Sequence, residues 1–303
     1  MLDTTISRFI NYLKVERNAS PHTITSYRKD LESFSLFLVG YDAQVRENPD
    51  AITRFHLRAW MGQLSDDGLS RSSIARKVSC LKSFFKYTLA RGYTTKNPAE
   101  LVFIPKTEKK LPVNLQADEA LEMLTGFPVE TDWDAQEKAI MELLYATGIR
   151  LAELISVDVR DVQSGARLLR VTGKGSKERI VPYGEHARDA LDDWLSRRPR
   201  CADPQAPEAD RRALFVSKSG RRIYPVAVQR IVKKHISRVS EISKKSPHVL
   251  RHSFATHLLA KGADIRVIKE FLGHAALTST QVYTQTSVEH LKKVHEKAHP
   301  RGH

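Results

Sequence analysis

Cysteine is scarce in this chain. Cys80 and Cys201 are the two cysteines among 303 residues, and they lie far apart in the sequence. A disulfide framework or a cysteine-based zinc site normally shows several cysteines at short, regular spacings. Neither is indicated here, and reduced thiols of this kind fit a cytoplasmic protein best.

Long apolar runs are missing as well. A helix that crosses a bilayer needs about 20 consecutive apolar residues, and the sequence contains no such uninterrupted run. The N-terminus, from Met1 to Thr5, also lacks the charged and then apolar pattern of a signal peptide. We therefore expect a protein of the cytoplasm that has no membrane partner.

Acidic residues are few relative to basic ones. The chain has 49 Lys and Arg against 35 Asp and Glu, a formal net charge of +14 and a pI of about 9.7. Basic side chains displace the counterions that condense on nucleic acid, so this charge favours a polyanionic partner. A merely solvated basic surface is the alternative, which net charge alone leaves open.

The first hundred residues predict a bundle of helices. Ser20 followed by Pro21 is typical of a helix start. Apolar residues then recur every three or four positions from Ile24 to Leu38, which predicts one buried stripe. A further helix is expected over residues 52–64.

Another helix, expected over residues 72–91, has two different faces. Its apolar stripe consists of Ile74, Val78, Leu81, Phe85 and Leu89. On the opposite face, small hydroxyls alternate with cations at Ser72, Arg76, Ser79, Ser83 and Lys86. Such a face can lie against DNA and hydrogen-bond to its phosphates. An ordinary solvated helix face is an equally good alternative.

Two prolines, Pro105 and Pro112, bracket a charged and polar run that is typical of a linker between domains. The sequence therefore predicts one domain over residues 1–108 and a second over residues 109–303.

The second domain is predicted to be mostly helical, with a small antiparallel sheet. Strands over residues 168–172 and 179–182 flank a glycine-rich turn, which indicates a β-hairpin, and a third strand is expected over 213–216. Helices are expected over residues 117–125, 134–147, 226–242, 248–261, 265–272, 278–283 and 288–297. The fold class is therefore mainly α, within the α+β class.

Ser246 and Pro247 indicate a helix start whose free N–H groups would favour a phosphate. His248 in the first turn and Arg251 one turn later share a face. The Arg251 guanidinium can hold two phosphate oxygens, and His248 can donate a hydrogen bond or accept a proton. The alternatives are histidines of the core, or zinc held by His248 and His252, although the glutamate of HExxH is missing.

Three further positions could reach the same phosphate. Arg150 follows Gly148, which would end a helix and turn the chain. Lys174 lies between two glycines of the hairpin turn, which lets the turn approach a ligand closely. His274 follows a glycine at another predicted helix end. Taken singly, each is more simply a surface or turn residue.

Tyr283 follows nine residues after His274. A tyrosine normally has a pKa near 10 and is a poor nucleophile at neutral pH. Beside two arginines and a phosphate its oxygen could attack, because protein nucleophiles need such activation. A buried structural tyrosine is the default alternative.

In their order and spacing, these residues resemble those of the tyrosine recombinases, and most closely those of the bacterial Xer recombinases. The resemblance covers nearly the whole chain. In the second domain it rests on residues 147–154, 173–179, 248–257, 272–274 and 280–284. In the first domain it rests on Ser20, Thr23, Tyr27, Asp30, Leu31 and Phe34.

The resemblance implies a SAM-like, core-binding helical bundle followed by a catalytic domain. It implies that Arg150 and Arg251 clamp the scissile phosphate and that His274 hydrogen-bonds to it. No cofactor and no metal are implied.

The remaining roles are also implied by the resemblance. Tyr283 would be the nucleophile, forming a 3′-phosphotyrosyl bond and releasing a 5′-hydroxyl. Lys174 would be the general acid for the 5′ oxygen, and His248 would assist proton transfer.

The implied partner is double-stranded DNA with a specific recombination site. The implied assembly is a tetramer of this chain, alone or with a paralogous recombinase, that exchanges strands through a Holliday junction. Its C-terminal helix, with Val288, Leu291 and Val294 in an apolar stripe, would pack on a neighbouring protomer; packing on its own domain is the competing possibility. The implied role is resolution of chromosome dimers at cell division, with a DNA translocase as activator. A type IB topoisomerase, an integrase of a mobile element and a non-catalytic DNA-binding protein are the alternatives.

Overall fold

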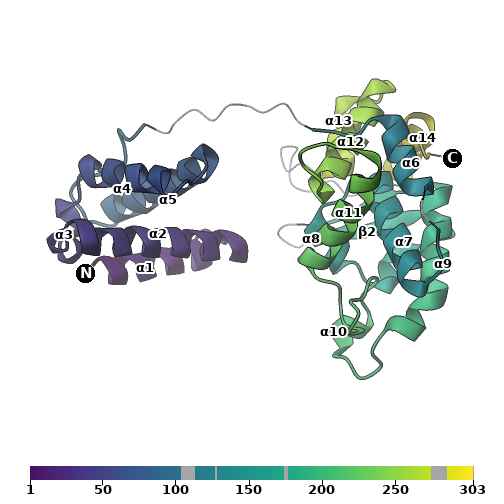
Figure 1. Cartoon of the computed structure of the whole chain (residues 1–303), viewed down its shortest axis with the longest axis horizontal. Coiled ribbons are helices and arrows are strands. Elements are labelled where there is room, and N and C mark those ends of the chain that lie inside the picture. Colours follow the sequence, from purple (N-terminus) through teal and green to yellow (C-terminus); the bar gives the residue numbers. More distant parts are fainter. Residues whose placement is uncertain (104–112, 127, 174–176, 274–284, 303) are drawn as a thin grey trace. The chain divides into compact units, whose positions relative to one another are not determined.

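The computed structural model describes residues 1–103, 113–126, 128–173, 177–273 and 285–302 (Figure 1). The chain divides into two compact units, Met1–Lys110 and Leu111–His303. Each unit buries a hydrophobic core of its own, as a folding domain does. In the described part of the chain, no helix is long and apolar enough to cross a membrane.

The first unit is a bundle of helices joined by short turns. Its elements are α1 (Leu2–Val15), α2 (Pro21–Tyr41), α3 (Gln44–Glu47), the 3-10 helix η1 (Pro49–Ala51), α4 (Arg54–Asp66) and α5 (Arg71–Ala90). The predicted start of α2 is confirmed, because the Ser20 side chain accepts a hydrogen bond from the Thr23 N–H at 3.2 Å.

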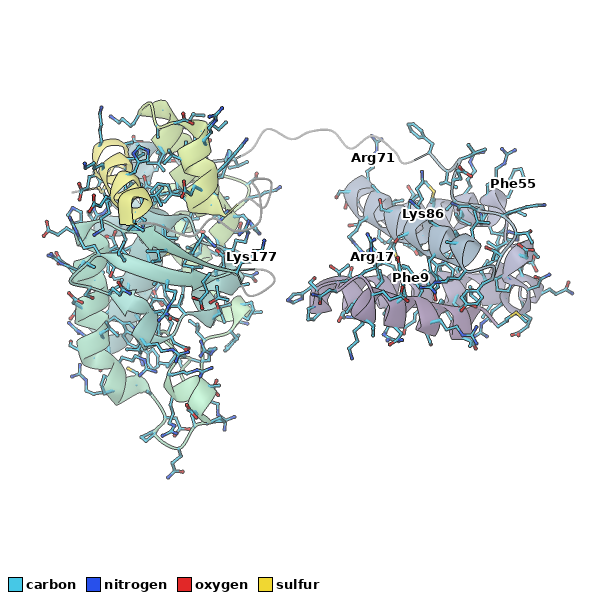
Figure 2. All side chains as sticks on the ribbon, turned by 180° about the vertical axis from the view of Figure 1, so that it is seen from behind. Phe9, Arg17, Phe55, Arg71, Lys86 and Lys177 are labelled. Atoms are coloured by element: carbon cyan, nitrogen blue, oxygen red, sulfur yellow. The ribbon has the colours of Figure 1, made fainter. Side chains whose placement is uncertain are left out.

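Aromatic side chains fill the core of this bundle. Phe9 of α1, labelled in Figure 2, is fully buried. Its ring lies edge-on to that of Phe84 of α5. The apolar stripe of α5 is confirmed except at Leu89, whose side chain is 43% exposed. The helical period explains the error, since the buried positions continue from Phe85 to Thr88 rather than to Leu89.

The second unit surrounds a long buried helix, α7, with other helices and a small sheet. Its helices are α6 (Ala117–Thr125), α7 (Asp132–Thr147), α8 (Leu151–Ser156), the 3-10 helix η2 (Val159–Asp161), α9 (Glu185–Cys201), α10 (Glu208–Arg211), α11 (Pro225–Val239), α12 (Pro247–Ala260), α13 (Ile265–Leu272) and α14 (Gln285–Ala298). α9 runs beside α7 (Figure 1) and packs along it.

The sheet is antiparallel, with strand order β1-β2-β3. β2 (Leu168–Thr172) and β3 (Glu178–Pro182) form the predicted hairpin, with Leu169 opposite Val181. The third strand is β1 (Val162–Gln163), so its prediction over residues 213–216 is wrong. Those residues are buried, but they form two isolated bridges, Ala213 with Asp158 and Val216 with Arg222, in place of a strand. The Leu214 N–H donates to the Val157 carbonyl of a loop.

Other expected elements differ from the structure in smaller ways. The longest helix that the sequence analysis missed is α9, and α8 was missed as well. α11 ends three residues earlier than expected, at Val239. The expected helix over residues 278–283 lies outside the described residues.

The last helix, α14, packs on its own domain, against β3, α12 and α13. Leu291 of its predicted apolar stripe is buried, and Val288 and Val294 are partly buried. In this structure the helix therefore adopts the arrangement that was the competing possibility in the sequence analysis.

Candidate active site

The site begins at a sharp turn after α7. Gly148 ends this helix with a left-handed backbone, at a φ of 59°. A Cβ at this position would lie 2.5 Å from a ring carbon of Phe254, so only glycine fits. The turn makes Arg150 the N-cap residue of α8. The predicted end of the helix at Gly148 is thus confirmed.

Glu153 fixes Arg150 from one turn farther along α8. Its carboxylate accepts hydrogen bonds from the Arg150 backbone N–H at 2.8 Å and from Arg150 Nη1 at 2.9 Å. It also accepts hydrogen bonds from Nη1 and Nη2 of Arg179, at 2.8 Å each. Glu153 and Arg179 are 4% and 7% exposed, so this pair is internal. Burial alone would raise the pKa of Glu153, but the hydrogen bonds from Arg179 and Arg150 lower it to about 2.

Arg251 reaches the same place from α12. Its Nη1 donates to the Gly148 carbonyl at 2.5 Å and its Nη2 to the Leu272 carbonyl at 2.6 Å. Arg150 Nη2 donates to the next carbonyl, that of Gly273, at 3.3 Å. The two guanidinium groups therefore meet at the C-terminal end of α13, where the helix dipole favours positive charge. Burial, and next the nearby charge of Arg150, lower the pKa of Arg251 to about 10, so it stays cationic at neutral pH.

Two glycines bring further segments to this cluster. Gly273 has a left-handed φ of 61°, and a Cβ there would lie 3.1 Å from the Arg179 guanidinium. Gly173 closes the base of the hairpin by donating to the Lys177 carbonyl at 2.7 Å. A Cβ on Gly173 would lie 3.6 Å from the Glu153 carboxylate. The residues that precede Lys174 and His274 in the chain thus both lie beside the Glu153–Arg179 pair.

The structure places only some of the predicted residues. It brings Arg150 and Arg251 together, and it leaves His248 exposed in the first turn of α12, three residues before Arg251. Three predicted residues lie outside the described part of the chain: Lys174, His274 and Tyr283. Within the described ranges, no group of three His, Cys, Asp or Glu side chains is close enough to hold a metal ion.

Glu153 and Arg179 were missed as individual residues, although both lie in segments that the sequence analysis singled out. One local signal could have pointed to Glu153. It follows Arg150 by three residues at a helix start, which is the spacing of a capping box. Arg179 has no comparable local signal, because its partner lies 26 residues away.

The C-terminal segment packs against the end of α7, next to this site. His295 Nε2 lies 2.8 Å from the Ala146 carbonyl, and His299 Nε2 lies 3.1 Å from the Tyr145 carbonyl. Both carbonyls belong to the last turn of α7, just before Gly148, and both imidazoles are buried and stacked on each other. Burial lowers the pKa of His295 to about 4, so the imidazole is neutral there at neutral pH. α14 therefore holds the end of α7 in place.

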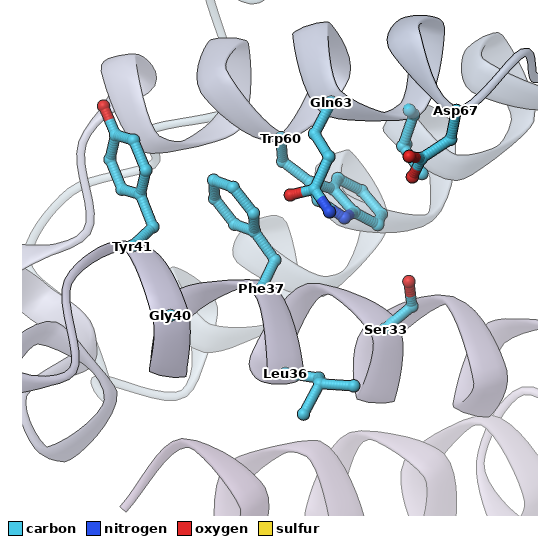
Figure 3. Close-up of a pocket in the computed structure, with 9 residues that line it drawn as sticks. Ser33, Leu36, Phe37, Gly40, Tyr41, Trp60, Gln63 and Asp67 are labelled. Atoms are coloured by element: carbon cyan, nitrogen blue, oxygen red, sulfur yellow. The ribbon is translucent and has the colours of Figure 1, made fainter.

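The predicted polar face of α5 is only partly available in the structure. Ser72, Ser79 and Lys86 are exposed, whereas Arg76 forms an ion pair with Asp30 of α2. The hollow between α2 and α4 shown in Figure 3 is a different surface. The described residues that line it include apolar side chains, such as Phe37 and Trp60, and no cation, so it is unsuited to a phosphate.

Comparison with known proteins places the whole chain. Residues 113–290 match the model of the phage integrase family, and residues 6–92 match the phage integrase N-terminal SAM-like domain. The chain belongs to the phage integrase family, the tyrosine recombinases. The resemblance inferred from the sequence is thereby confirmed, as is the mainly α fold with a SAM-like first domain.

Relatives within this family are similar over nearly their whole length. The chain is 38% identical over 312 residues to a protein of Chlorobaculum parvum named tyrosine recombinase XerC, covering 96% of this chain and 93% of that protein. It is 39% identical over 299 residues to a protein of the same name from Pelobacter propionicus, covering 98% and 95%.

Solved structures of recombinases share the fold. XerH recombinase bound to a palindromic difH substrate is 22% identical with a TM-score of 0.68, covering 95% of this chain and 83% of that one. The Tn1549 transposon integrase in complex with circular intermediate DNA is 19% identical with a TM-score of 0.69, covering 94% and 98%.

Proposed function

We propose that this protein is a site-specific recombinase of the Xer type, which cuts and rejoins DNA through a covalent tyrosyl intermediate. The observation that carries the proposal is the pairing of Arg150 and Arg251 at the end of α13. Both guanidinium groups are held by fixed acceptors, and among the described residues both have N–H groups without an acceptor, which suit a further ligand. A pair of oriented cations suits a phosphodiester whose negative charge increases in the transition state.

In the proposed reaction the Tyr283 oxygen attacks the scissile phosphorus. A bond forms between that oxygen and phosphorus while the bond from phosphorus to the 5′ oxygen breaks. Lys174 donates the proton that the 5′ oxygen needs, and His248 helps to take the proton from the tyrosine. Arg150 and Arg251, with His274, stabilise the phosphoryl oxygens.

Rejoining is the same step in reverse, with a 5′-hydroxyl of the other strand as nucleophile. The tyrosyl linkage keeps the free energy of the phosphodiester, so the chemistry needs neither ATP nor a metal ion. The protein's own residues do the work, by orientation and by proton transfer.

The partner is double-stranded DNA with a recombination site, bound by a core-binding domain over residues 1–108 and a catalytic domain over 109–303. XerC relatives and DNA-bound recombinase structures support this partner. The active assembly is a tetramer, formed with itself or with a paralogue, in which α14 exchanges onto a neighbour. The cellular role is resolution of chromosome dimers in the cytoplasm, with a DNA translocase as activator. An integrase of a mobile element is the second candidate, supported by the fold shared with the Tn1549 integrase.

The test uses a nicked suicide duplex that carries a candidate recombination site from the replication-terminus region of the host chromosome. The native protein should form an adduct that survives denaturation, and Tyr283→Phe should form none. An adduct that persists in Tyr283→Phe would exclude this nucleophile. Specific binding without an adduct, even with the paralogue added, would favour the non-catalytic alternative.

A further inference from the structure

Arg76 of α5 forms an ion pair with a buried carboxylate. Its Nη1 and Nη2 both donate to Asp30 of α2, the Nη2 bond measuring 2.9 Å. Nη1 also donates to Ser26 Oγ at 2.6 Å. Asp30 is 2% exposed, whereas the Arg76 side chain is 47% exposed. A half-exposed guanidinium is therefore fixed in orientation by groups on the neighbouring helix.

The position of the Asp30 carboxylate is itself fixed by a second ion pair. It accepts a second ion pair from Lys77 Nζ at 3.0 Å, and that ammonium lies 5.5 Å from the centre of the Trp60 ring. A shift of the carboxylate toward solvent would break this second ion pair. Asp30 therefore holds the Arg76 guanidinium in one orientation.

The hydrogen bonds of Arg76 leave one edge of its guanidinium available. Arginine has five N–H donors in a planar fork. Three of them are used by Asp30 and Ser26, and within the described residues the other two have no acceptor. These two, on Nε and on the outer side of Nη2, point the same way. An arginine fork of this kind matches the O6 and N7 acceptors of guanine in the major groove.

Two other cations of α5 have no such partners in the part of the chain that the structure describes. Arg71 and Lys86, both labelled in Figure 2, are exposed and have no side-chain hydrogen bond within the described residues. Mobile cations of this kind can follow the phosphate backbone, where contacts give affinity but no sequence information. A guanidinium fixed at three donors loses less freedom when it binds, and it suits an acceptor pair of fixed geometry.

We propose that Arg76, oriented by Asp30 and Ser26, determines specificity by hydrogen-bonding one guanine of the recombination site in the major groove. The inference rests on the proposed function, because it requires a DNA duplex on this face of α5. It adds a specificity-determining residue outside the catalytic domain.

The test measures binding of the full-length protein to its cognate duplex and to duplexes in which each base pair is exchanged in turn, at one salt concentration. Arg76→Lys keeps a charge beside Asp30 but lacks the fork. It should lose discrimination at a single G·C pair by roughly 5- to 150-fold and leave the other positions unchanged. Ser26→Ala should weaken discrimination at the same pair. Arg71→Ala is the matched control, and it should weaken binding to all duplexes alike.

A modified base identifies the acceptor. Replacing the guanine by 7-deazaguanine removes N7, so it should weaken binding of the native protein and have no further effect on Arg76→Lys. A uniform loss of affinity in Arg76→Lys would mean a phosphate contact, and an unchanged specificity profile would mean a purely structural ion pair. Either result would overturn the inference while leaving the recombinase proposal intact. Native protein that prefers no duplex would instead overturn the proposed function.

Discussion

Both units of this molecule orient arginine with a buried carboxylate, but the surroundings of that carboxylate differ. In the first unit, Asp30 holds Arg76 and Lys77, and all three lie on two neighbouring helices. In the second unit, Glu153 holds Arg150 and Arg179, which lie at the N-cap of α8 and on β3. The second arrangement is also connected through backbone carbonyls to the ends of α7 and α13.

Under the proposed function, the first arrangement belongs to a binding surface and the second to a reaction site. Contacts of a helix face to phosphates can tolerate local adjustment, since each contributes its own part of the affinity. A site that stabilises a transition state must hold several groups at fixed positions together. The cluster of Glu153, Arg150, Arg179 and Arg251 meets that need because α8, β3, α12 and α13 converge on it, and changes there should have the larger effects.

The largest effect is expected from removing the charge of Glu153. Glu153→Gln leaves Arg179 buried with no carboxylate, which should lower the unfolding free energy of the second unit by about 3–5 kcal/mol. Asp30→Asn should cost the first unit only about 1–3 kcal/mol, because Arg76 is half exposed and the flexible side chain of Lys77, 14% exposed, can move its ammonium to water. Urea unfolding of both variants measures the two values, and equal losses would contradict the comparison.

The next largest effect is expected at the turn after α7. Gly148→Ala places a methyl group against Phe254 in a left-handed conformation, so a loss of about 2–4 kcal/mol is expected. Gly92→Ala is the matched control in the first unit. Its φ is also positive, at 69°, but a Cβ there would meet nothing within 4 Å, so about 1 kcal/mol is expected. Thermal unfolding of the two variants would decide, and similar losses would show that close packing at Gly148 is unimportant.

A lower pH should reduce the stability of the second unit more than that of the first. His295 has a pKa lowered to about 4, against about 6.5 in the unfolded chain, so below pH 6.5 the unfolded state binds more protons. Its contribution is therefore constant above pH 6.5 and falls by about 3 kcal/mol as the pH drops to about 4. His299, also buried with a lowered pKa, acts in the same direction. The first unit has His22 and His56, neither of them buried.

Hydrogen exchange at several pH values measures this difference. Amides of α7 and α14 should lose protection as the pH falls from 6.5 to 4, before those of α1 and α2. In His295→Asn this loss should be smaller. Equal loss of protection in both units of the native protein would contradict the assignment of the acid sensitivity to these histidines.

The smallest effect is expected at the surface of the first unit. Arg91 donates to both carboxylate oxygens of Glu16 at 2.6 Å, but both side chains are largely exposed. Glu16→Gln should therefore change the unfolding free energy by less than about 1 kcal/mol. A loss as large as that of Asp30→Asn would show that exposure is a poor guide to the strength of these pairs.

Local signals in the sequence predicted much of the fold and part of the site. Ser20 with Pro21 starts a helix, and Gly148 and Gly273 end helices, because these residues satisfy or permit backbone geometries that others do not. The first of these ends also positions Arg150, and the second immediately precedes His274 in the sequence. The regular apolar period predicted α2 and α5.

Other features depend on contacts that no local pattern contains. The buried residues of α9 are Ala187, Ala190, Leu191 and Trp194. Their spacing is helical, but two of the four are small alanines in an otherwise polar helix, so the apolar stripe is inconspicuous in the sequence. The run over residues 213–216 has the composition of a strand, but its hydrogen bonds go to loops and side chains. The Glu153–Arg179 pair and the docking of His295 on α7 join residues that are distant in sequence, so only the folded chain reveals them.

The most direct test of the central claim is single-turnover cleavage of the suicide duplex by Arg150→Lys and Arg251→Lys, with binding to the same duplex titrated in parallel. If the paired guanidinium groups stabilise the transition state, both variants should bind within about tenfold of the native protein and cleave about 10²- to 10³-fold more slowly. Cleavage at the native rate by either variant would contradict the claim that this pair of arginines holds the scissile phosphate.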